Sequence, residues 1–459
     1  MLGLIRSKFT LFVAAIMLAA GSTTFAQEPL LVPPSVEILT LDKAIDLALV
    51  NNRSAKNARL ETDKNDERTA AARTHLLPGF QMNAGISKPL TSFDTTFEKG
   101  VFGTFPSGPV PNEDTVITSS TKPTAAIVGQ LVQPLSQLHR IKLQIKQQEA
   151  ATEISRAQLS ATEQALVNEV KRAYYAILQS QGAAQAAEVN IKLYRELDRV
   201  TGEYVVQQVA LKTELMDVQT RLAKAEYDLM TIDNQLLSQK EQLNNLLGRD
   251  VRIEFAVSSG EETALAVMRE TDLLAARERA LANRPEIREA KLKVEQAKLD
   301  KRIKKSEFIP DVSLTVNYAT TFSYSNFVPR SLSGVGVQVQ WEAFDWGRKK
   351  HEVADKDKSI TQAANSLLDT ESQVLMEVNS RFRQMQETRQ LLKVAKLAQT
   401  QARANVQLVT YKYRLDAVLL KDVLQAQTVL ANSDYDYQKA LLAFWTAKAD
   451  FEKAIGEDK

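Results

Sequence analysis

The sequence predicts a mainly helical protein with a small β part, built from two like halves. A heptad-spaced apolar seam runs from Leu215 to Leu246, and it recurs 208 residues later with most of its apolar character. Short segments of alternating apolar and polar residues precede each long helix. These patterns predict long coiled-coil helical hairpins that pack side by side into one continuous tube. They also predict a shared 12-stranded transmembrane β-barrel, with four strands from each chain.

The heptad seam predicts that each half ends in a coiled-coil helix. Its members follow one another at intervals of three or four residues, with one longer gap at Gln239, and polar residues occupy the other faces. The first seam comprises Leu215, Val218, Leu222, Ala225, Leu229, Ile232, Leu236, Leu243 and Leu246. The second comprises Val423, Ala426, Leu430, Ser433, Tyr437, Ala440, Phe444, Phe451 and Ala454. Gly248 and Gly456 follow the two helices at the same offset.

The front of each half repeats as well, at an offset of 232 residues that aligns Asn51 with Asn283 and Pro78 with Pro310. A glycine- and proline-rich loop at about 93–122 accounts for the change of offset to 208. We expect repeat 1 at 39–250 and repeat 2 at 271–459, each reading helix, strand, strand, long helix, helix. The expected strands are 79–92 and 121–133 in repeat 1, and 312–324 and 334–341 in repeat 2. A linker at 251–270 joins the repeats.

The N-terminus predicts a secretory signal peptide at 1–26, with charged Arg6 and Lys8, a short apolar run and cleavage after Ala26. An extended strap at 27–38 follows. Removing Arg6 and Lys8 reduces the 58 basic residues to 56, against 56 acidic ones, which argues against a nucleic-acid partner. The chain has no cysteine, its three histidines are far apart, and no nucleophile–base or phosphate-binding motif is present. We therefore expect no enzyme activity, no cofactor and no metal site.

The alternating segments predict strands with one apolar and one polar face. Four strands alone leave two open edges, which are untenable in lipid, so we expect three copies to close one barrel. The residues expected to face lipid are Phe80, Met82, Ile86, Val312, Leu314, Val316, Val335, Val337 and Val339. Those expected to face water inside are Gln81, Asn83, Ser87, Ser313, Thr315, Asn317, Gln338 and Gln340. Trp341 and Trp346 suit an aromatic belt, although a soluble sheet with aromatics at its rim is the alternative.

The long helices, at about 135–203 and 348–411, contain no proline and are too polar outside to lie in a membrane. At about 1.5 Å per residue, each would span roughly 100 Å. They are expected to project into an aqueous compartment, with small seam residues permitting close packing. A dimeric coiled-coil scaffold is the alternative interpretation.

With these features, the chain resembles the TolC-like outer membrane efflux proteins, also called outer membrane factors. The resemblance rests on the repeated openings at 41–52 and 280–286, on the segment Lys421 to Gln427, and on the glycines after the rods. It implies a homotrimer in the cell outer membrane, with the helical hairpins forming a trimeric α-barrel as its large periplasmic portion. It also implies partnership with a periplasmic adaptor (membrane fusion) protein and an inner-membrane pump.

The resemblance implies a periplasmic gate at the helix turns, where Tyr413 and Asp422 match family gate residues and Glu214 stands at the acidic position of the first half. Val418 and Gln425 depart from the family pattern, so the closed state would rely less on salt bridges. Two interpretations of the carboxylates stay open. They form acidic rings that raise their pKa or recruit cations, or they are solvated first-turn residues favoured by the helix dipole.

The same turns carry apolar residues, which suggests a docking surface, and in the family the adaptor meets these turns. Ordinary loop packing is the alternative. The candidate docking residues are Val209, Ala210, Leu211, Ala417, Val418 and Leu419. We therefore expect a passive export duct of a tripartite efflux or type I secretion system, opened at its periplasmic end by docking. The alternatives are a periplasmic coiled-coil spacer without a pore and a general porin.

Overall fold

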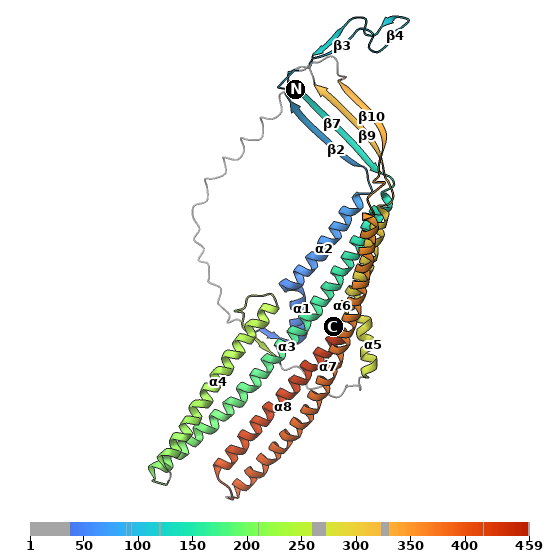
Figure 1. Cartoon of the computed structure of the whole chain (residues 1–459). Coiled ribbons are helices and arrows are strands. Elements are labelled where there is room, and N and C mark those ends of the chain that lie inside the picture. Colours follow the sequence, from blue (N-terminus) through green and yellow to red (C-terminus); the bar gives the residue numbers. More distant parts are fainter. Residues whose placement is uncertain are drawn as a thin grey trace, which may run out of the picture.

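The computed structural model describes residues 37–88, 90–92, 94–118, 121–209, 211–258, 272–322, 330–415 and 417–457. The signal peptide, the strap before residue 37, most of the linker and Ala210 lie outside these ranges. The helices are α1 (Leu41–Asn51), α2 (Arg53–Thr74), α3 (Leu138–Val206), α4 (Lys212–Leu246), α5 (Leu273–Asn283), α6 (Pro285–Ser306), α7 (Arg348–Arg414) and α8 (Leu420–Ile455). The chain is an elongated, curved body with the sheet at one end and two helical hairpin turns at the other (Figure 1).

The main sheet has four antiparallel strands in the order β10-β9-β7-β2. Its strands are β2 (Gly79–Ser87), β7 (Thr124–Pro134), β9 (Asp311–Phe322) and β10 (Ser331–Gln340). Below the sheet, α2, α3, α6 and α7 lie side by side in that order, so the helical layer continues the strand layer. Nearer the turns the order is α4, α3, α8, α7, because α3 and α7 run the whole length.

The helices of the two halves begin and end at nearly equivalent positions. Adding 232 to the bounds of α1 and α2 gives those of α5 and α6, and adding 208 to the end of α3 gives the end of α7. The single helix expected at the start of repeat 1 is two helices, because Asn52 interrupts it. The Asn52 side chain accepts hydrogen bonds from the Ser54 and Ala55 amides and donates to the Leu246 carbonyl at 2.9 Å. It thereby begins α2 and holds it to the end of α4.

Segments between the main elements carry strands that the sequence pattern does not reveal. The loop after β2 forms a projecting arm of two small hairpins, β3 (Asp94–Phe97) with β6 (Thr115–Thr118) and β4 (Thr104–Phe105) with β5 (Gly108–Pro109). Within the expected linker, β8 (Phe255–Val257) pairs in parallel with β1 (Glu37–Leu39). The Tyr174 hydroxyl contacts the Leu39 and Ser258 carbonyls at 2.9 and 2.8 Å, which fastens this pair to α3.

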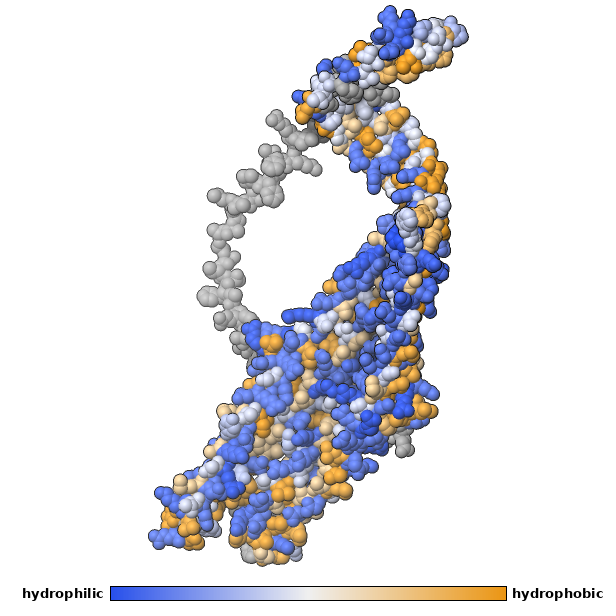
Figure 2. Space-filling view, in the orientation of Figure 1, coloured by the Kyte–Doolittle hydropathy of each residue, from blue (hydrophilic) through white to orange (hydrophobic). Residues whose placement is uncertain are grey.

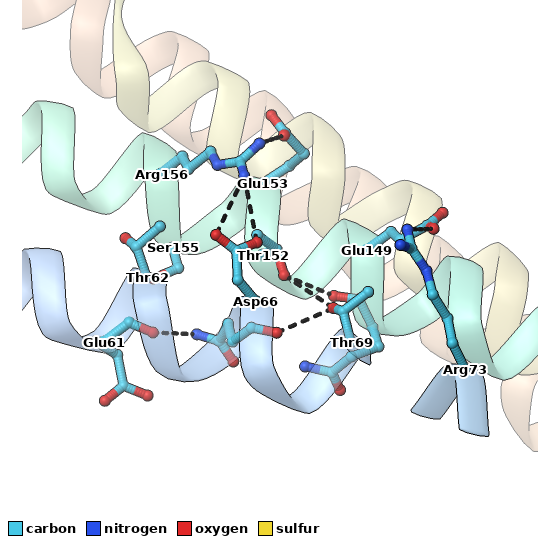
Figure 3. Close-up of polar contacts among 12 residues, drawn as sticks. Glu61, Thr62, Asp66, Thr69, Arg73, Glu149, Thr152, Glu153, Ser155 and Arg156 are labelled. Carbon is cyan, nitrogen blue, oxygen red and sulfur yellow. Dashed lines mark hydrogen bonds and ion pairs between the residues drawn. The ribbon is translucent and has the colours of Figure 1, made fainter. Parts of the chain in front are cut away.

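Two different kinds of contact hold the helices together. Around α1, the middle of α3 and the end of α4, buried apolar side chains form one core, and a second surrounds α7 and α8. Nearer the sheet, α2 meets α3 mainly through polar side chains. Thr69 and Thr152 are joined at 3.2 Å, and Arg156 bridges Asp66 and Glu153 (Figure 3). Hydrogen-bonded polar pairs keep this narrow interface satisfied without a wide apolar core.

The helix seams are buried to different degrees because of their places in the layer. The α8 seam lies between α3 and α7, and most of its members are buried. The α4 helix packs mainly against α3, and its seam members up to Leu236 are only half-buried. The open flank of α4 is therefore an edge of the helical layer, as β2 and β10 are edges of the sheet.

Candidate functional site: the two-faced sheet and the helix turns

The strand register separates apolar from polar side chains across the main sheet. Residues directly opposite one another in an antiparallel pair lie on the same face. Met82 is opposite Gly129, which is opposite Tyr318, and Leu131 is opposite Phe80 and Val316. Pairing of β9 with β10 adds Val335, Val337 and Val339 to the same face. All nine predicted apolar residues thus share one face, and the eight predicted polar residues share the other.

Aromatic side chains gather where the sheet gives way to the helices. Trp341 directly follows β10, and Phe344 stacks edge-on against Trp346 with ring centroids 4.7 Å apart. Trp346 is 88% exposed. Figure 2 shows a strip of apolar surface at this level. Such rings favour the interface between hydrocarbon and water. Sequence reasoning identified the two tryptophans and missed Phe344, which lies between them.

The two helix turns lie together at the far end of the molecule (Figure 1). Val209, Leu211, Ala417 and Leu419 are exposed, and Val418 is half-buried. The structure adds two exposed apolar residues that the sequence analysis missed, Val206 and Leu415, which lie at or beside the C-terminal ends of α3 and α7. Both residues lie within about one helical turn of the candidate docking residues, and this proximity in sequence could have identified them. Exposed apolar clusters of this kind commonly mark contact surfaces.

Glu214 and Asp422 occupy the same place in the two repeats, the third residue of α4 and of α8. The Asp422 carboxylate accepts a hydrogen bond from the Leu419 amide at 3.0 Å. The side chain of Leu419 is a hydrocarbon and cannot accept a hydrogen bond in return, so only half of a capping box is present. Asp422 therefore caps α8, and its negative charge also suits the positive end of the helix dipole.

Tyr413 lies in the last turn of α7, and its side chain is partly exposed. Within the described part of the chain, no hydrogen bond or ion pair joins Tyr413, Glu214 and Asp422 to one another. The structure brings the three residues to the same end of the molecule without linking them inside one copy.

A buried carboxylate that the sequence analysis did not single out joins three helices. Asp450 on α8 is 4% exposed and accepts hydrogen bonds from Arg172 and Asn168 on α3. Arg381 on α7 pairs with the same carboxylate at 3.2 Å. We call Asp450, Arg172, Arg381 and Asn168 the clamp. Close by, burial together with the charge of Glu452 raises the pKa of Tyr175 to about 12.

The described residues include neither a metal-binding cluster nor a membrane-spanning helix. Among the described residues, no group of three or more histidine, aspartate or glutamate side chains is placed to hold a metal ion. In the same ranges, no helix combines the length and hydropathy that a bilayer crossing requires.

Comparisons with known proteins match this architecture. The sequence profile described as outer membrane efflux protein matches residues 44–249 and 276–457. No curated protein matches the chain in sequence. The outer-membrane channel OprN has a TM-score of 0.72 at 17% identity, over 91% of this chain and 90% of that chain. The CmeC outer membrane channel of Campylobacter jejuni has a TM-score of 0.72 at 16% identity, over 91% and 85%.

The open state of the MtrE outer membrane channel of Neisseria gonorrhoeae has a TM-score of 0.65 at 17% identity, over 91% of this chain and 88% of that chain. At these identities, the structural likeness shows the fold. The profile match extends over both repeats and covers most of the sequence. The chain belongs to the outer membrane efflux protein family.

Proposed function

We propose that three copies of this chain form a passive export duct across the outer membrane and periplasm. The observation that carries the proposal is the single layer with two open edges. Among the described residues, β2 and β10 each lack a strand partner on one side, and the α4 seam up to Leu236 is half-buried. A closed barrel of twelve strands removes the open edges, with apolar residues toward lipid and amides and hydroxyls toward water. The helices continue the barrel as a tube.

The direct test is to extract the protein from outer membranes and measure both its native mass and its conductance in planar bilayers. We expect extraction to require detergent, a particle of three chains and discrete single-channel steps. A monomer released without detergent, with no conductance, would favour the pore-less spacer and overturn the duct. Uptake of small solutes in cells that lack any pump would favour a general porin.

In this duct, Glu214, Tyr413 and Asp422 are proposed to form the periplasmic gate. Three-fold symmetry turns each carboxylate into a ring of three like charges, which attracts cations. The exposed turn residues provide the surface on which an adaptor docks, and a separate inner-membrane pump supplies the energy. Because Asp422 also caps α8, its charge and its capping role have to be tested separately.

Removing charge from the acidic rings is expected to weaken block by divalent cations about tenfold, equivalent to about 1.4 kcal/mol of cation binding. The variants are Glu214→Gln and Asp422→Asn, the latter because the asparagine side-chain oxygen can still accept the hydrogen bond from the Leu419 amide. Single-channel recordings with added divalent cation give the measurement. Asp217→Asn removes a carboxylate one turn further along α4, where Asp217 pairs with Arg221, and serves as the control. Unchanged block and opening in both gate variants would refute the acidic rings.

Photo-crosslinking from Leu211 or Leu419 is expected to capture a periplasmic adaptor in intact cells, since both side chains are exposed at the turns. The control is the same probe at Leu237, an exposed apolar position further along α4. Equal capture at the control position, or none at the turns, would leave the exposed residues as ordinary loop surface.

A further inference from the structure

The edges that remain open in one copy define a contact surface for a second copy, and the internal repeat allows its register to be worked out. This inference deepens the proposed trimer and rests on it. The repeat holds at the level of individual strand pairs. Adding 232 to Gly79 and 208 to its partner Val132 gives Asp311 and Gln340, which are an observed pair. Ser87 and Thr124 likewise give Ala319 and Leu332, also an observed pair.

Inside the chain, repeat 1 meets repeat 2 where β7 pairs with β9. A closed ring of such chains needs a second junction between a repeat 2 and a repeat 1. We take this junction to resemble the internal one, so that β10 stands in the place of β7 and β2 of the next copy in the place of β9. The same offsets then convert each observed pair into an intermolecular one. Val132 and Thr315 become Gln340 and Asn83, while Gly129 and Tyr318 become Val337 and Ile86.

We propose that β10 of one copy pairs antiparallel with β2 of the next, with Gln340 opposite Asn83, Val339 opposite Ala84 and Val337 opposite Ile86. The two faces of the sheet are consistent with this register. Val337 and Ile86 both lie on the apolar face, and Gln340 and Asn83 both lie on the polar face. A slip of one residue would bring every side chain of one strand to the wrong face.

The helices next to these strands give a second check. Within the chain, Gln147 on α3 donates a hydrogen bond to Asp300 on α6. The same offsets convert this pair into Asp355 on α7 and Arg68 on α2 of the next copy, which are opposite charges. The other two polar side-chain pairs between α3 and α6 become Ser366 with Asn57 and Thr361 with Lys56. None of the three converted pairs brings like charges together.

The register is tested by cysteine pairs in a chain that has no cysteine of its own. Directly opposite residues have Cβ atoms about 4.5–5.5 Å apart, close to disulfide reach, whereas four residues along a strand add roughly 13 Å. The variant Gln340→Cys with Asn83→Cys should form disulfide-linked dimers and trimers on mild oxidation, seen on non-reducing gels. The matched control is Gln340→Cys with Ser87→Cys, on the same polar face. This pair should give at least tenfold less disulfide-linked dimer and trimer.

Native mass and conductance are measured on the same samples. Trimeric, conducting protein that crosslinks through Ser87 and not through Asn83 would overturn the register while leaving the duct intact. Monomeric, non-conducting protein would overturn both proposals.

Charge reversal supplies a test that needs no disulfide. Arg68→Glu should reduce the trimer fraction at least threefold, and adding Asp355→Arg should restore it. Arg68 also contacts Glu61 and Asn65 in its own chain. Failure of Asp355→Arg to restore assembly would mean that only these internal contacts matter, and would contradict the intermolecular pair.

Discussion

Replacing Asp450 with alanine is expected to destabilise the protein by about 3 kcal/mol, the lower end of the cost of breaking a buried ion pair. Two arginines lose their shared partner, and α8 loses one of its polar links to α3 and one to α7. The lower end applies because Arg172 and Arg381 are 48% and 33% exposed, so that water can still reach both guanidinium groups.

The measurement is the guanidinium-induced unfolding midpoint of the assembled protein, followed by circular dichroism. Gln242→Ala is the matched control, since Gln242 stands 208 residues before Asp450 at the equivalent place in α4 and is exposed. We expect a change within about 0.5 kcal/mol there. Arg172→Ala should cost less than Asp450→Ala, because Arg381 and Asn168 still hold the carboxylate. Equal effects of Asp450→Ala and Gln242→Ala would show that the clamp adds nothing to stability.

Substituting Gly248 with alanine is expected to cost about 3 kcal/mol, and more than the same change at Gly456. Gly248 has φ +67°, a conformation that costs a residue with a Cβ about 1–2 kcal/mol. An added Cβ would lie 2.4 Å from the Asn51 carbonyl oxygen. That oxygen belongs to the backbone at the α1–α2 break, so it can move aside only by disturbing both helices.

Gly456 is the natural comparison because it has φ +74° and occupies the repeated position. An added Cβ there would meet Asn283 at 3.1 Å at closest, so mainly the conformational cost applies. Gly182→Ala adds a third reference, since the nearest obstacle is the flexible amide of Gln438. The thermal midpoints should fall most for Gly248→Ala. A larger loss at Gly456 than at Gly248 would contradict the contact with Asn51.

Features repeated with a regular period were predictable from the sequence. The alternation at 80–87 and 312–318 was sufficient to assign side chains to faces, because a strand places every second residue on the same side. The 208-residue offset located the two coiled-coil helices, since their seams recur every 3.5 residues on average. The first helix begins after Thr40, whose hydroxyl accepts a hydrogen bond from the Lys43 amide, a cap that threonine commonly provides.

What was missed depends on contacts between distant positions. Asp450 and Arg172 are 278 residues apart, and nothing in either local pattern indicates that they meet. Asn52 lies in a stretch that otherwise reads as one helix, and its role as a cap depends partly on the Leu246 carbonyl from the end of repeat 1. The hairpins of the arm are too short, at two to four residues per strand, to show a period.

The open-edged layer has a consequence for how the protein comes to be stable. In the proposed trimer, the half-buried α4 seam and the outer strands β2 and β10 would be covered only by neighbouring copies. Folding and assembly would then be linked by mass action, so that the resistance of each copy to heat or denaturant would depend on protein concentration. Diluting such a trimer would lower its apparent stability, as adding a denaturant does.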